Sequence, residues 1–358
     1  MSRVFAIAAN ARYYHFFQRN MNLMRIIAVI VTLGFFVLAF ASATPAKPPF
    51  PVFVQSLKQR LEHDGFSAHL VNEAFEGVRY YHRTVYKSKH QPEVKLTLQG
   101  YLKHMMVPGR ISAGYEYMQQ HAALLKQVEA RYHVQGKYVV ALLGLESSYG
   151  RVEGKFPEIS TLATLIYDSP RSTYFYKELR YALKIVQRGD VDFKDLKGSW
   201  AGAMGQPQFM PTHYYDYAVD FNHDGKKDIW HSTPDVLGSI AYSLHRYGWE
   251  YKKPIVMPVR FKSHVPYSLL GTRHHFPLAF WLQRGLVADQ DVSAYKREQV
   301  SVVKLGDQFF MLFKNYKVLY AWNHSIYYVI TVKHLANVIS LPKAQVSEYL
   351  ESHYHEKL

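Results

Sequence analysis

A single glutamate, Glu146, follows an apolar run in the stretch ALLGLESSYGRVEG, residues 141–154. Acidic side chains are seldom buried without a partner, so one interpretation is a turn cap or an ion pair with Arg151. The other is a general acid. Leu142 and Leu143 lie one helical turn before Glu146, and an apolar setting raises the pKa of a carboxyl because it disfavours the charged form. Such a glutamate keeps its proton near neutral pH and can donate it to a glycosidic oxygen.

The stretch GSWAGAMGQPQFMPTHY, residues 198–214, is rich in small residues that let the backbone approach a ligand closely. Trp200, Phe209 and Met210 can supply an apolar wall, and Gln208 can supply an amide for sugar hydroxyls. The alternative is a tightly packed turn, because the run GQPQ has ordinary turn chemistry. Composition alone leaves both interpretations open.

The stretch DFNHDGKKDIW, residues 220–230, matches the start of an EF-hand loop, with Gly225 at position 6. The oxygen ligands expected at positions 1, 3, 5 and 7 are Asp220, Asn222, Asp224 and the carbonyl of Lys226. Position 12 is His231, which cannot be the bidentate acid, so Asp228 and Asp235 are the candidates that close the site. The alternative is a surface turn rich in Asx residues.

The composition describes an ordinary globular protein with a basic balance. The chain has 358 residues, 48% of them hydrophobic and 15% aromatic, and a formal net charge of +15. The basic residues are spread along the chain, and no finger, RNP or Gly-rich phosphate motif accompanies them. Nucleic acid is therefore not an expected partner, whereas an anionic polymer is.

The N-terminus has the pattern of a secretory signal peptide. Arg25 precedes an apolar run over residues 26–40 and the tripeptide Ala41-Ser42-Ala43. We predict a signal peptide within residues 1–43, with translation starting at Met21 or Met24, and a periplasmic protein. An uncleaved membrane anchor is the alternative, and only then do we expect membrane contact. The chain has no cysteine, so it has neither disulfides nor the lipid-bearing cysteine of a lipoprotein.

The periodicity then predicts the elements that position these residues. Residues 44–51 form a Pro-rich extended linker. Helical spacing is found over residues 53–65, 70–80, 96–106, 112–132, 137–148, 179–186, 234–247 and 327–349. The runs PIVMPVRF, VSVVKL, QFFMLF and KVLYAW predict strands of a small β sub-domain over residues 252–322.

These stretches together resemble the lytic murein transglycosylase B family of bacterial cell-wall enzymes, from about residue 50 to the C-terminus. The stretches ATLIYDSPRSTYF and WNHSIYY add to the match. The resemblance implies a predominantly helical α+β fold. Residues 111–251 are expected to form a lysozyme-like core, residues 52–110 and 323–358 an α region from both chain ends, and residues 252–322 the β sub-domain.

The resemblance also implies a reaction. Glu146 is the expected sole acid/base, which cleaves the β-1,4 bond between N-acetylmuramic acid and N-acetylglucosamine without water and leaves a 1,6-anhydro end. The expected substrate contacts are Ser199, Gln208, Tyr101, Trp322, Tyr328, Tyr242 and Arg171, the last meeting stem-peptide carboxylates. The metal loop is expected to use Asp235 as its late ligand. The chemistry needs no cofactor, and Ca²⁺ or Na⁺ is a structural candidate.

The expected partners are peptidoglycan strands with stem peptides, and other cell-wall enzymes are candidates. Three residues depart from the family pattern: Ser172 replaces a second arginine, Trp322 a tyrosine, and Ser243 part of an Asn-Tyr pair. Two alternatives to the transglycosylase remain. One is a hydrolytic muramidase, whose second carboxylate comes from Glu153, Glu158 or Asp168. The other is a non-catalytic wall-binding protein. A calcium sensor is disfavoured, because the loop is single and its twelfth position is weak.

Overall fold

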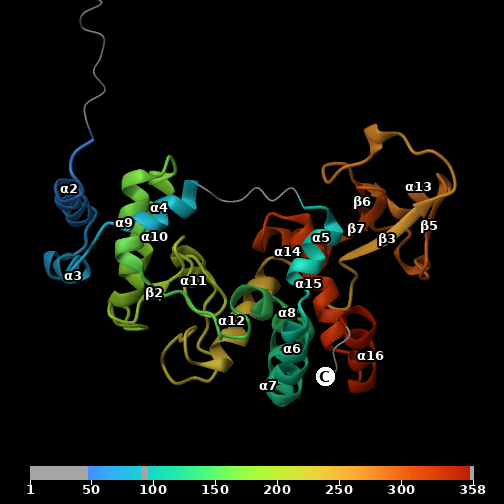
Figure 1. Cartoon of the computed structure of the whole chain (residues 1–358), viewed down its shortest axis with the longest axis horizontal. Coiled ribbons are helices and arrows are strands. Elements are labelled where there is room, and N and C mark those ends of the chain that lie inside the picture. Colours follow the sequence, from blue (N-terminus) through green and yellow to red (C-terminus); the bar gives the residue numbers. More distant parts are fainter. Residues whose placement is uncertain (1–46, 90–95, 355–358) are drawn as a thin grey trace, which may run out of the picture. The chain divides into compact units, whose positions relative to one another are not determined.

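The computed structural model describes residues 47–89 and 96–354 (Figure 1). The chain divides into two units, residues 1–53 and 54–358. In the first unit, the described residues comprise an irregular segment, 47–49, and the first turn of a helix that begins at Phe50. The predicted signal peptide and residues 44–46 lie outside the described residues. The prediction of an extended linker through Pro51 is wrong at its end, because proline in the first turn of a helix lacks only an N–H that has no intrahelical partner.

Helices make up most of the described chain, with one small antiparallel sheet. The helices are α2 (Phe50–His63), α3 (Ala68–Ala74), α4 (His82–Lys89), α5 (Leu98–Met105), α6 (Pro108–Gln120), α7 (Ala122–Tyr132), α8 (Gly136–Ser147), α9 (Glu158–Asp168), α10 (Ser172–Gln187), α11 (Pro211–Tyr217), α12 (Thr233–Arg246), α13 (Leu278–Gln283), α14 (Lys314–Trp322), α15 (Ile326–Ile339) and α16 (Lys343–Tyr354). Two short 3-10 helices, η1 (Tyr267–Leu269) and η2 (Ser293–Tyr295), complete them. No helix in the described part of the chain has the length and apolar character needed to cross a membrane.

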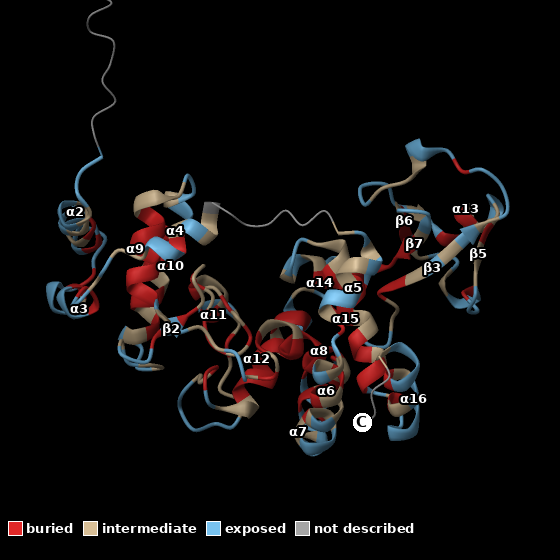
Figure 2. Ribbon diagram, viewed as in Figure 1, coloured by how far each residue is buried: buried red, intermediate tan, exposed pale blue. Residues whose placement is uncertain are grey.

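Helix α8 is the centre of the second unit. Its residues are almost all apolar, and nine of its twelve residues are buried (Figure 2). Helices α6, α7, α12 and α15 pack around it. A helix that is apolar on every side is stable only when other elements cover it, so α8 is a fixed support for whatever side chain stands at its C-terminus.

The small sheet lies after α12 and matches most of the predicted β sub-domain. Its strands are β3 (Val256–Phe261), β4 (Phe276–Pro277), β5 (Leu286–Ala288), β6 (Gln299–Leu305) and β7 (Gln308–Leu312), in the antiparallel order β4-β6-β7-β3-β5. Trp281 of α13 is fully buried and packs with Met311 and Val302 in the core of this sub-domain. A separate two-stranded pair, β1 (Phe156–Pro157) with β2 (Lys197–Gly198), lies before α9 and after α10.

The run KVLYAW is helical, so its prediction as a strand is wrong. The run belongs to α14, whose buried residues follow helical spacing at Asn315, Tyr316, Val318 and Leu319. Its apolar side chains are therefore covered on one helical face, and α14 packs against α15. Packing of this kind overrides the strand preference of valine, tyrosine and tryptophan.

Two of the predicted helices are each divided in two. The helix predicted over 112–132 breaks at His121, which leaves helical geometry (φ −105°, ψ 18°) and stacks on Tyr117 with ring centroids 4.2 Å apart. The helix predicted over 327–349 breaks between Ile339 and Lys343, where Pro342 cannot continue it.

The helices before residue 110 pack against different neighbours. Helix α3 packs against α10, and α4 packs against α9. Helix α5 instead packs against α15, which also covers α6 and α8. The fold therefore is predominantly helical with a small antiparallel β sub-domain. The further division into a core and an α region from both chain ends stays a prediction.

Candidate active site

The Glu146 carboxylate lies in the last turn of α8 and has two hydrogen-bond donors. Trp322 Nε1 donates to Glu146 Oε1 at 2.9 Å, and the Tyr328 hydroxyl donates to the same oxygen at 2.5 Å. Glu146 Oε2 has no partner among the described residues and is not one of their buried unpartnered atoms. One oxygen of the carboxyl is therefore held by the protein, and the other is left for a substrate.

The environment of Glu146 favours its protonated form. Burial of the carboxyl raises its pKa above the usual value, and the hydrogen bonds from Tyr328 and Trp322 oppose this by stabilising the charge. Tyr101, which is partly buried, has a raised pKa because of burial and of the nearby Glu146 charge. No other carboxylate contributes to the Glu146 shift among the described residues.

A short left-handed segment ends α8 directly after Glu146. Ser148, Tyr149 and Gly150 have φ values of 51°, 63° and 78°. The Tyr149 ring turns back against the helix, where its hydroxyl donates to the Arg110 carbonyl oxygen at 2.9 Å. A Cβ at Gly144 would lie only 2.4 Å from Tyr149 Cζ, so the helix can hold this ring only with a glycine there. The ring thereby fixes the helix end that carries Glu146.

The turn between α14 and α15 brings both donors to Glu146. Trp322 is the last residue of α14, and Tyr328 lies in the first turn of α15, whose N-cap Ser325 accepts a hydrogen bond from the Tyr328 amide at 3.3 Å. The Tyr101 ring of α5 contacts the Tyr327 ring at 5.8 Å. Three predicted substrate contacts, Tyr101, Trp322 and Tyr328, thus gather around the predicted acid.

A partly buried histidine that the sequence analysis did not select, His213, supports Trp322. The His213 ring lies 5.7 Å from the Trp322 ring, and Phe209 lies 5.5 Å from the same indole. Ser243 Oγ lies 2.9 Å from His213 Nε2, and the Tyr247 hydroxyl 3.1 Å from Nδ1. Burial lowers the pKa of His213 to about 4, so the ring is neutral at physiological pH. Ser243, one of the departures from the family pattern, therefore has a local structural role.

The loop over 198–210 uses two predicted substrate contacts to hold its own shape. Ser199 Oγ accepts from the amides of Ala201 at 3.3 Å and Ala203 at 3.2 Å. Gln208 has a φ of 54°, and its Nε2 donates to the Gly205 carbonyl at 2.8 Å. In the described part of the chain neither side chain has a hydrogen bond to Glu146, so their role toward a sugar stays a prediction.

Glu153, Glu158 and Asp168, the candidates for a second catalytic carboxylate, each interact with residues other than Glu146 and its two donors. Glu158 is fully buried without a hydrogen-bond partner among the described residues, and burial together with the Glu178 charge raises its pKa to about 8. Glu178 is also buried and accepts from the Thr212 amide at 2.8 Å and hydroxyl at 2.9 Å. Asp168 accepts from the Tyr80 hydroxyl, and the charges of His231 and Asp228 act on Glu153.

Two other predicted substrate contacts lie in neighbouring clusters. The Arg171 guanidinium is exposed at the N-terminus of α10, over the rings of Tyr174 at 5.6 Å and Phe175 at 5.3 Å. The Tyr242 hydroxyl accepts from Arg246 at 2.7 Å, and its ring contacts Tyr132 at 5.6 Å. Neither side chain has a contact with Glu146 or its two donors in the described structure.

The predicted metal loop gathers three carboxylates. Oxygen atoms of Asp220, Asp224 and Asp235 all lie within 4.8 Å of one another, and none of the three takes part in an ion pair among the described residues. Asn222 Oδ1 accepts from the Asp224 amide at 3.2 Å, and the Lys226 amide donates to Asp224 at 2.9 Å. The donor set is all oxygen and anionic, which fits a hard cation.

Asp235 is the buried member of this group. It accepts hydrogen bonds from the amides of Phe221 at 2.7 Å, Asn222 at 3.4 Å and Asp228 at 3.0 Å. It thereby holds the loop in shape as well as offering a carboxylate. Asp228, the other candidate, instead accepts from the amides of Trp230 and His231, both at 2.9 Å.

The comparisons with known proteins bear on the family and the overall fold of the chain. The model of the Transglycosylase SLT domain family matches residues 49–337. Membrane-bound lytic murein transglycosylase B of Escherichia coli K12 is 31% identical over 250 residues, which are 68% of this chain and 68% of that protein. The crystal structure of SltB3 from Pseudomonas aeruginosa in complex with NAG-anhNAM-pentapeptide has a TM-score of 0.77 and 35% identity, and covers 81% of this chain and 79% of that one.

A third relative was solved with a metal ion. The structure of the Escherichia coli lytic transglycosylase Slt35 in complex with calcium has a TM-score of 0.71 and 26% identity, and covers 85% of this chain and 96% of that one. The family match covers most of the chain, and the relatives share its fold over most of their lengths. The chain belongs to the Transglycosylase SLT domain family.

Proposed function

We propose that this protein is a lytic transglycosylase that cleaves the bond between N-acetylmuramic acid and N-acetylglucosamine in peptidoglycan. The observation that carries the proposal is the Glu146 carboxyl, with Oε1 held by two donors and Oε2 free of partners. The relatives support the same class of reaction, since one is named a lytic murein transglycosylase and another a lytic transglycosylase.

The reaction has two proton transfers, and Glu146 performs both. Its Oε2 proton passes to the glycosidic oxygen as the C1–O bond of the muramic residue breaks. The Glu146 carboxylate then takes the proton of the muramic C6 hydroxyl, whose oxygen forms the new bond to C1. The products are a free N-acetylglucosamine hydroxyl and a 1,6-anhydro ring, and Glu146 is again protonated. Trp322 and Tyr328 stabilise the carboxylate between the two transfers.

A single carboxylate is sufficient because the substrate supplies its own nucleophile. Most glycosidases use a pair of carboxylates. Here Glu158 is buried and protonated, and no carboxylate acts on Glu146 among the described residues. We assign Tyr101 to the wall of the groove beside the reacting sugar. The further substrate contacts in this proposal are Ser199, Gln208, Tyr242 and, toward stem-peptide carboxylates, Arg171.

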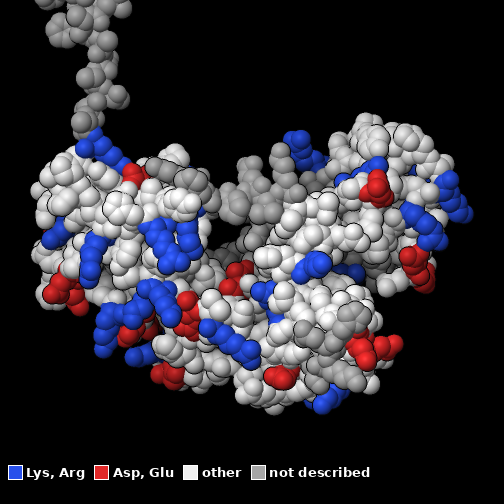
Figure 3. All heavy atoms as spheres, in the orientation of Figure 1, with Lys and Arg blue, Asp and Glu red and all other residues white. Residues whose placement is uncertain are grey.

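The basic surface suits an anionic polymer. Lys and Arg side chains are spread over the face shown in Figure 3, with acidic side chains between them. Peptidoglycan carries carboxylates on its stem peptides, and the net charge of +15 favours such a partner. We place the enzyme in the periplasm because of the signal-peptide pattern.

We infer that the loop over 220–235 binds one Ca²⁺ ion for stability. Asp220, Asp224 and Asp235 would hold the ion through carboxylate oxygens, with Asn222 and the Lys226 carbonyl as further ligands. A bound ion would neutralise the mutual repulsion of the three carboxylates. The loop follows the 198–210 segment, so the ion would act on the groove through the fold and take no part in the chemistry.

The test is Glu146→Gln, with product analysis by mass spectrometry on digested peptidoglycan. Glutamine keeps the shape and can accept from Trp322 and Tyr328, but it has no proton to exchange. Turnover should fall by about 10²–10⁴-fold or more, because one group serves both steps. Glu153→Gln is the matched control and should keep near-normal turnover. Wild-type products with reducing ends, one water heavier than the anhydro form, would indicate a muramidase instead.

A further inference from the structure

We propose that the groove between the β sub-domain and helix α14 is a second binding site for a peptidoglycan glycan strand, at a distance from the bond being cleaved. The proposed function supplies only the identity of the polymer. The groove has a volume of about 830 Å³. Tyr267 and Gly271 line one side of it, Lys304 lies at the end of β6, and Tyr320 and Tyr327 line the other side.

A row of aromatic rings runs along the α14 side of the groove. Tyr316 and Tyr320 are four residues apart and so share one face of α14, and His324 follows just past the end of the helix at Trp322. Their ring centroids are 5.4 Å apart for the first pair and 5.3 Å for the second. Tyr316 is buried, whereas Tyr320 is partly exposed and His324 is exposed. The rings of Tyr320 and His324 therefore offer stacking surfaces to a chain molecule.

The opposite rim carries an exposed ring that is held by a lysine. Tyr267 of η1 is 65% exposed, the highest value for a large hydrophobic side chain in the described part of the chain. Lys304 Nζ donates to the Tyr267 hydroxyl at 3.2 Å and lies 5.5 Å from its ring centroid. The ring is therefore kept beside the groove although it has almost no apolar cover.

The lining of the groove adjoins the residues that hold Glu146. Tyr327 lines the groove and contacts the Tyr101 ring at 5.8 Å, while the next residue, Tyr328, donates to Glu146. Helix α14 carries Tyr320 and ends at Trp322, the other donor to Glu146. A glycan strand whose scissile bond lies at Glu146 can therefore extend past Tyr327 and along α14.

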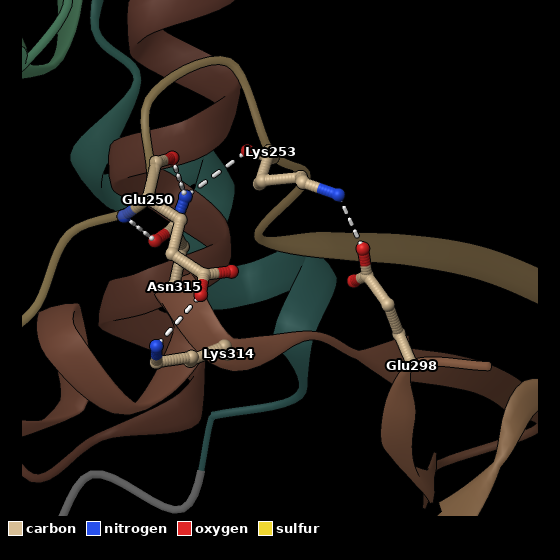
Figure 4. Close-up of polar contacts among 5 residues, drawn as sticks. All are labelled: Glu250, Lys253, Glu298, Lys314 and Asn315. Atoms are coloured by element: carbon tan, nitrogen blue, oxygen red, sulfur yellow. Dashed lines mark hydrogen bonds and ion pairs between the residues drawn. The ribbon is translucent and has the colours of Figure 1, made fainter. Parts of the chain in front are cut away.

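A polar network fixes the two walls of this groove relative to each other (Figure 4). Asn315, at the start of α14, is fully buried and donates to the carbonyls of Glu250 at 2.8 Å and Lys253 at 3.1 Å. Lys314 pairs with the Glu250 carboxylate at 2.6 Å, and Lys253 pairs with Glu298 before β6 at 2.5 Å. The segment that leads into the β sub-domain is thereby tied to α14, so the groove is a built feature of the fold.

The chemistry of the lining favours a sugar chain. A tyrosine presents an apolar ring face with a hydroxyl at its edge, which complements the C–H faces and hydroxyls of a saccharide. Positive charge is present in Lys304 and in Lys317, which lines an adjoining cavity of about 310 Å³ that shares Thr272 and Tyr316 with the groove. Lys317 has no ion pair among the described residues, so its charge can attract a stem-peptide carboxylate beside the glycan.

The test measures binding without turnover, on the full chain carrying Glu146→Gln. The probes are long glycan strands freed of their stem peptides and a tetrasaccharide of the same composition. Tyr267→Ala and Tyr320→Ala should each weaken long-strand binding relative to tetrasaccharide binding by about five- to tenfold, as expected for truncating an anchor ring. Tyr86→Ala removes a ring of matched exposure, 64%, and should leave the ratio unchanged.

The outcomes separate this site from the proposed activity. An unchanged ratio in both Tyr267→Ala and Tyr320→Ala refutes the groove as a glycan site, as does a loss seen only with peptide-bearing strands. Tyr320→Phe keeps the stacking ring and should keep the ratio, which distinguishes stacking from misfolding. Whether the wild type forms anhydro ends is read separately by mass spectrometry, so failure of the proposed function would not be confused with failure of this site.

Discussion

Replacing Glu158 with glutamine should stabilise the protein at alkaline pH. Glu158 is fully buried in α9, and neither carboxyl oxygen has a hydrogen-bond partner in the described structure. A Cβ at Gly198 would lie 2.6 Å from its Oε2, so the 198–202 backbone is tightly packed against the carboxyl. Burial raises the pKa of both carboxyls, but the two bonds from Thr212 favour the charged form of Glu178, whereas Glu158 has no donor and its pKa is raised to about 8.

The expected effect follows from proton linkage. The pKa of Glu158 is about 8 in the folded protein and near 4.5 when it is unperturbed. Between these values the unfolded chain has lost the proton that the folded protein retains, so the free energy of unfolding falls as pH rises, by about 1.4 kcal/mol per pH unit. Between pH 5.5 and 8 this amounts to about 3 kcal/mol, an order-of-magnitude value. A neutral glutamine amide removes this pH dependence.

Urea unfolding of wild type and Glu158→Gln across this pH range measures the effect. We expect similar stability near pH 5 and a growing advantage of the variant above pH 6. Glu62→Gln, an exposed change on α2, is the control and should follow the wild type. If Glu158→Gln and wild type lose stability in parallel as pH rises, Glu158 is not the protonated member of the pair and the reasoning is wrong.

Three further predictions concern the site and its supports. Trp322→Phe removes a donor that favours the charged form of Glu146, so the alkaline limb of the pH–activity profile should move to higher pH; an unchanged limb would contradict the assigned hydrogen bond. Gly144→Ala places a methyl 2.4 Å from the Tyr149 ring and should cost about 1–3 kcal/mol in the free energy of unfolding, whereas Gly109→Ala, with open space around its Cβ, should cost much less. Millimolar calcium should raise the melting temperature of the wild type, because an ion at 100 times its Kd adds about 2.7 kcal/mol to the free energy of unfolding. A chelator should reverse this rise, and the melting temperature of Asp224→Ala should not respond to calcium.

The sequence was most informative where functional residues lie in one short stretch. Glu146 stands at the end of an apolar helix, and WNHSIYY contains both of its donors, Trp322 and Tyr328, six residues apart across the turn between α14 and α15. The resemblance placed Trp322 and Tyr328 in the groove, but not on the carboxylate itself. The acidic loop is likewise local, and the structure brings Asp235 close to Asp220 and Asp224; that they bind a metal ion stays a prediction.

Residues that act through tertiary packing could not be found in this way. His213 pairs with Ser243 and Tyr247 across two helices, and its low pKa comes from burial alone. The charge of Glu178 on α10 acts on Glu158 on α9, and no local pattern marks either residue as buried. The strand prediction for KVLYAW failed for the same reason, because its β-type residues are covered by a neighbouring helix instead of a sheet.

Tryptophan at position 322, where the family pattern has tyrosine, strengthens the assignment of the Glu146 proton. A tyrosine hydroxyl can donate or accept, so two tyrosines would let either carboxyl oxygen carry the proton. The indole N–H of Trp322 can only donate, and it donates to Oε1. Oε1 already accepts from Trp322 and Tyr328, so we assign the proton to Oε2, which has no partner among the described residues. The departure thus directs the acidic proton toward the substrate side of the carboxyl.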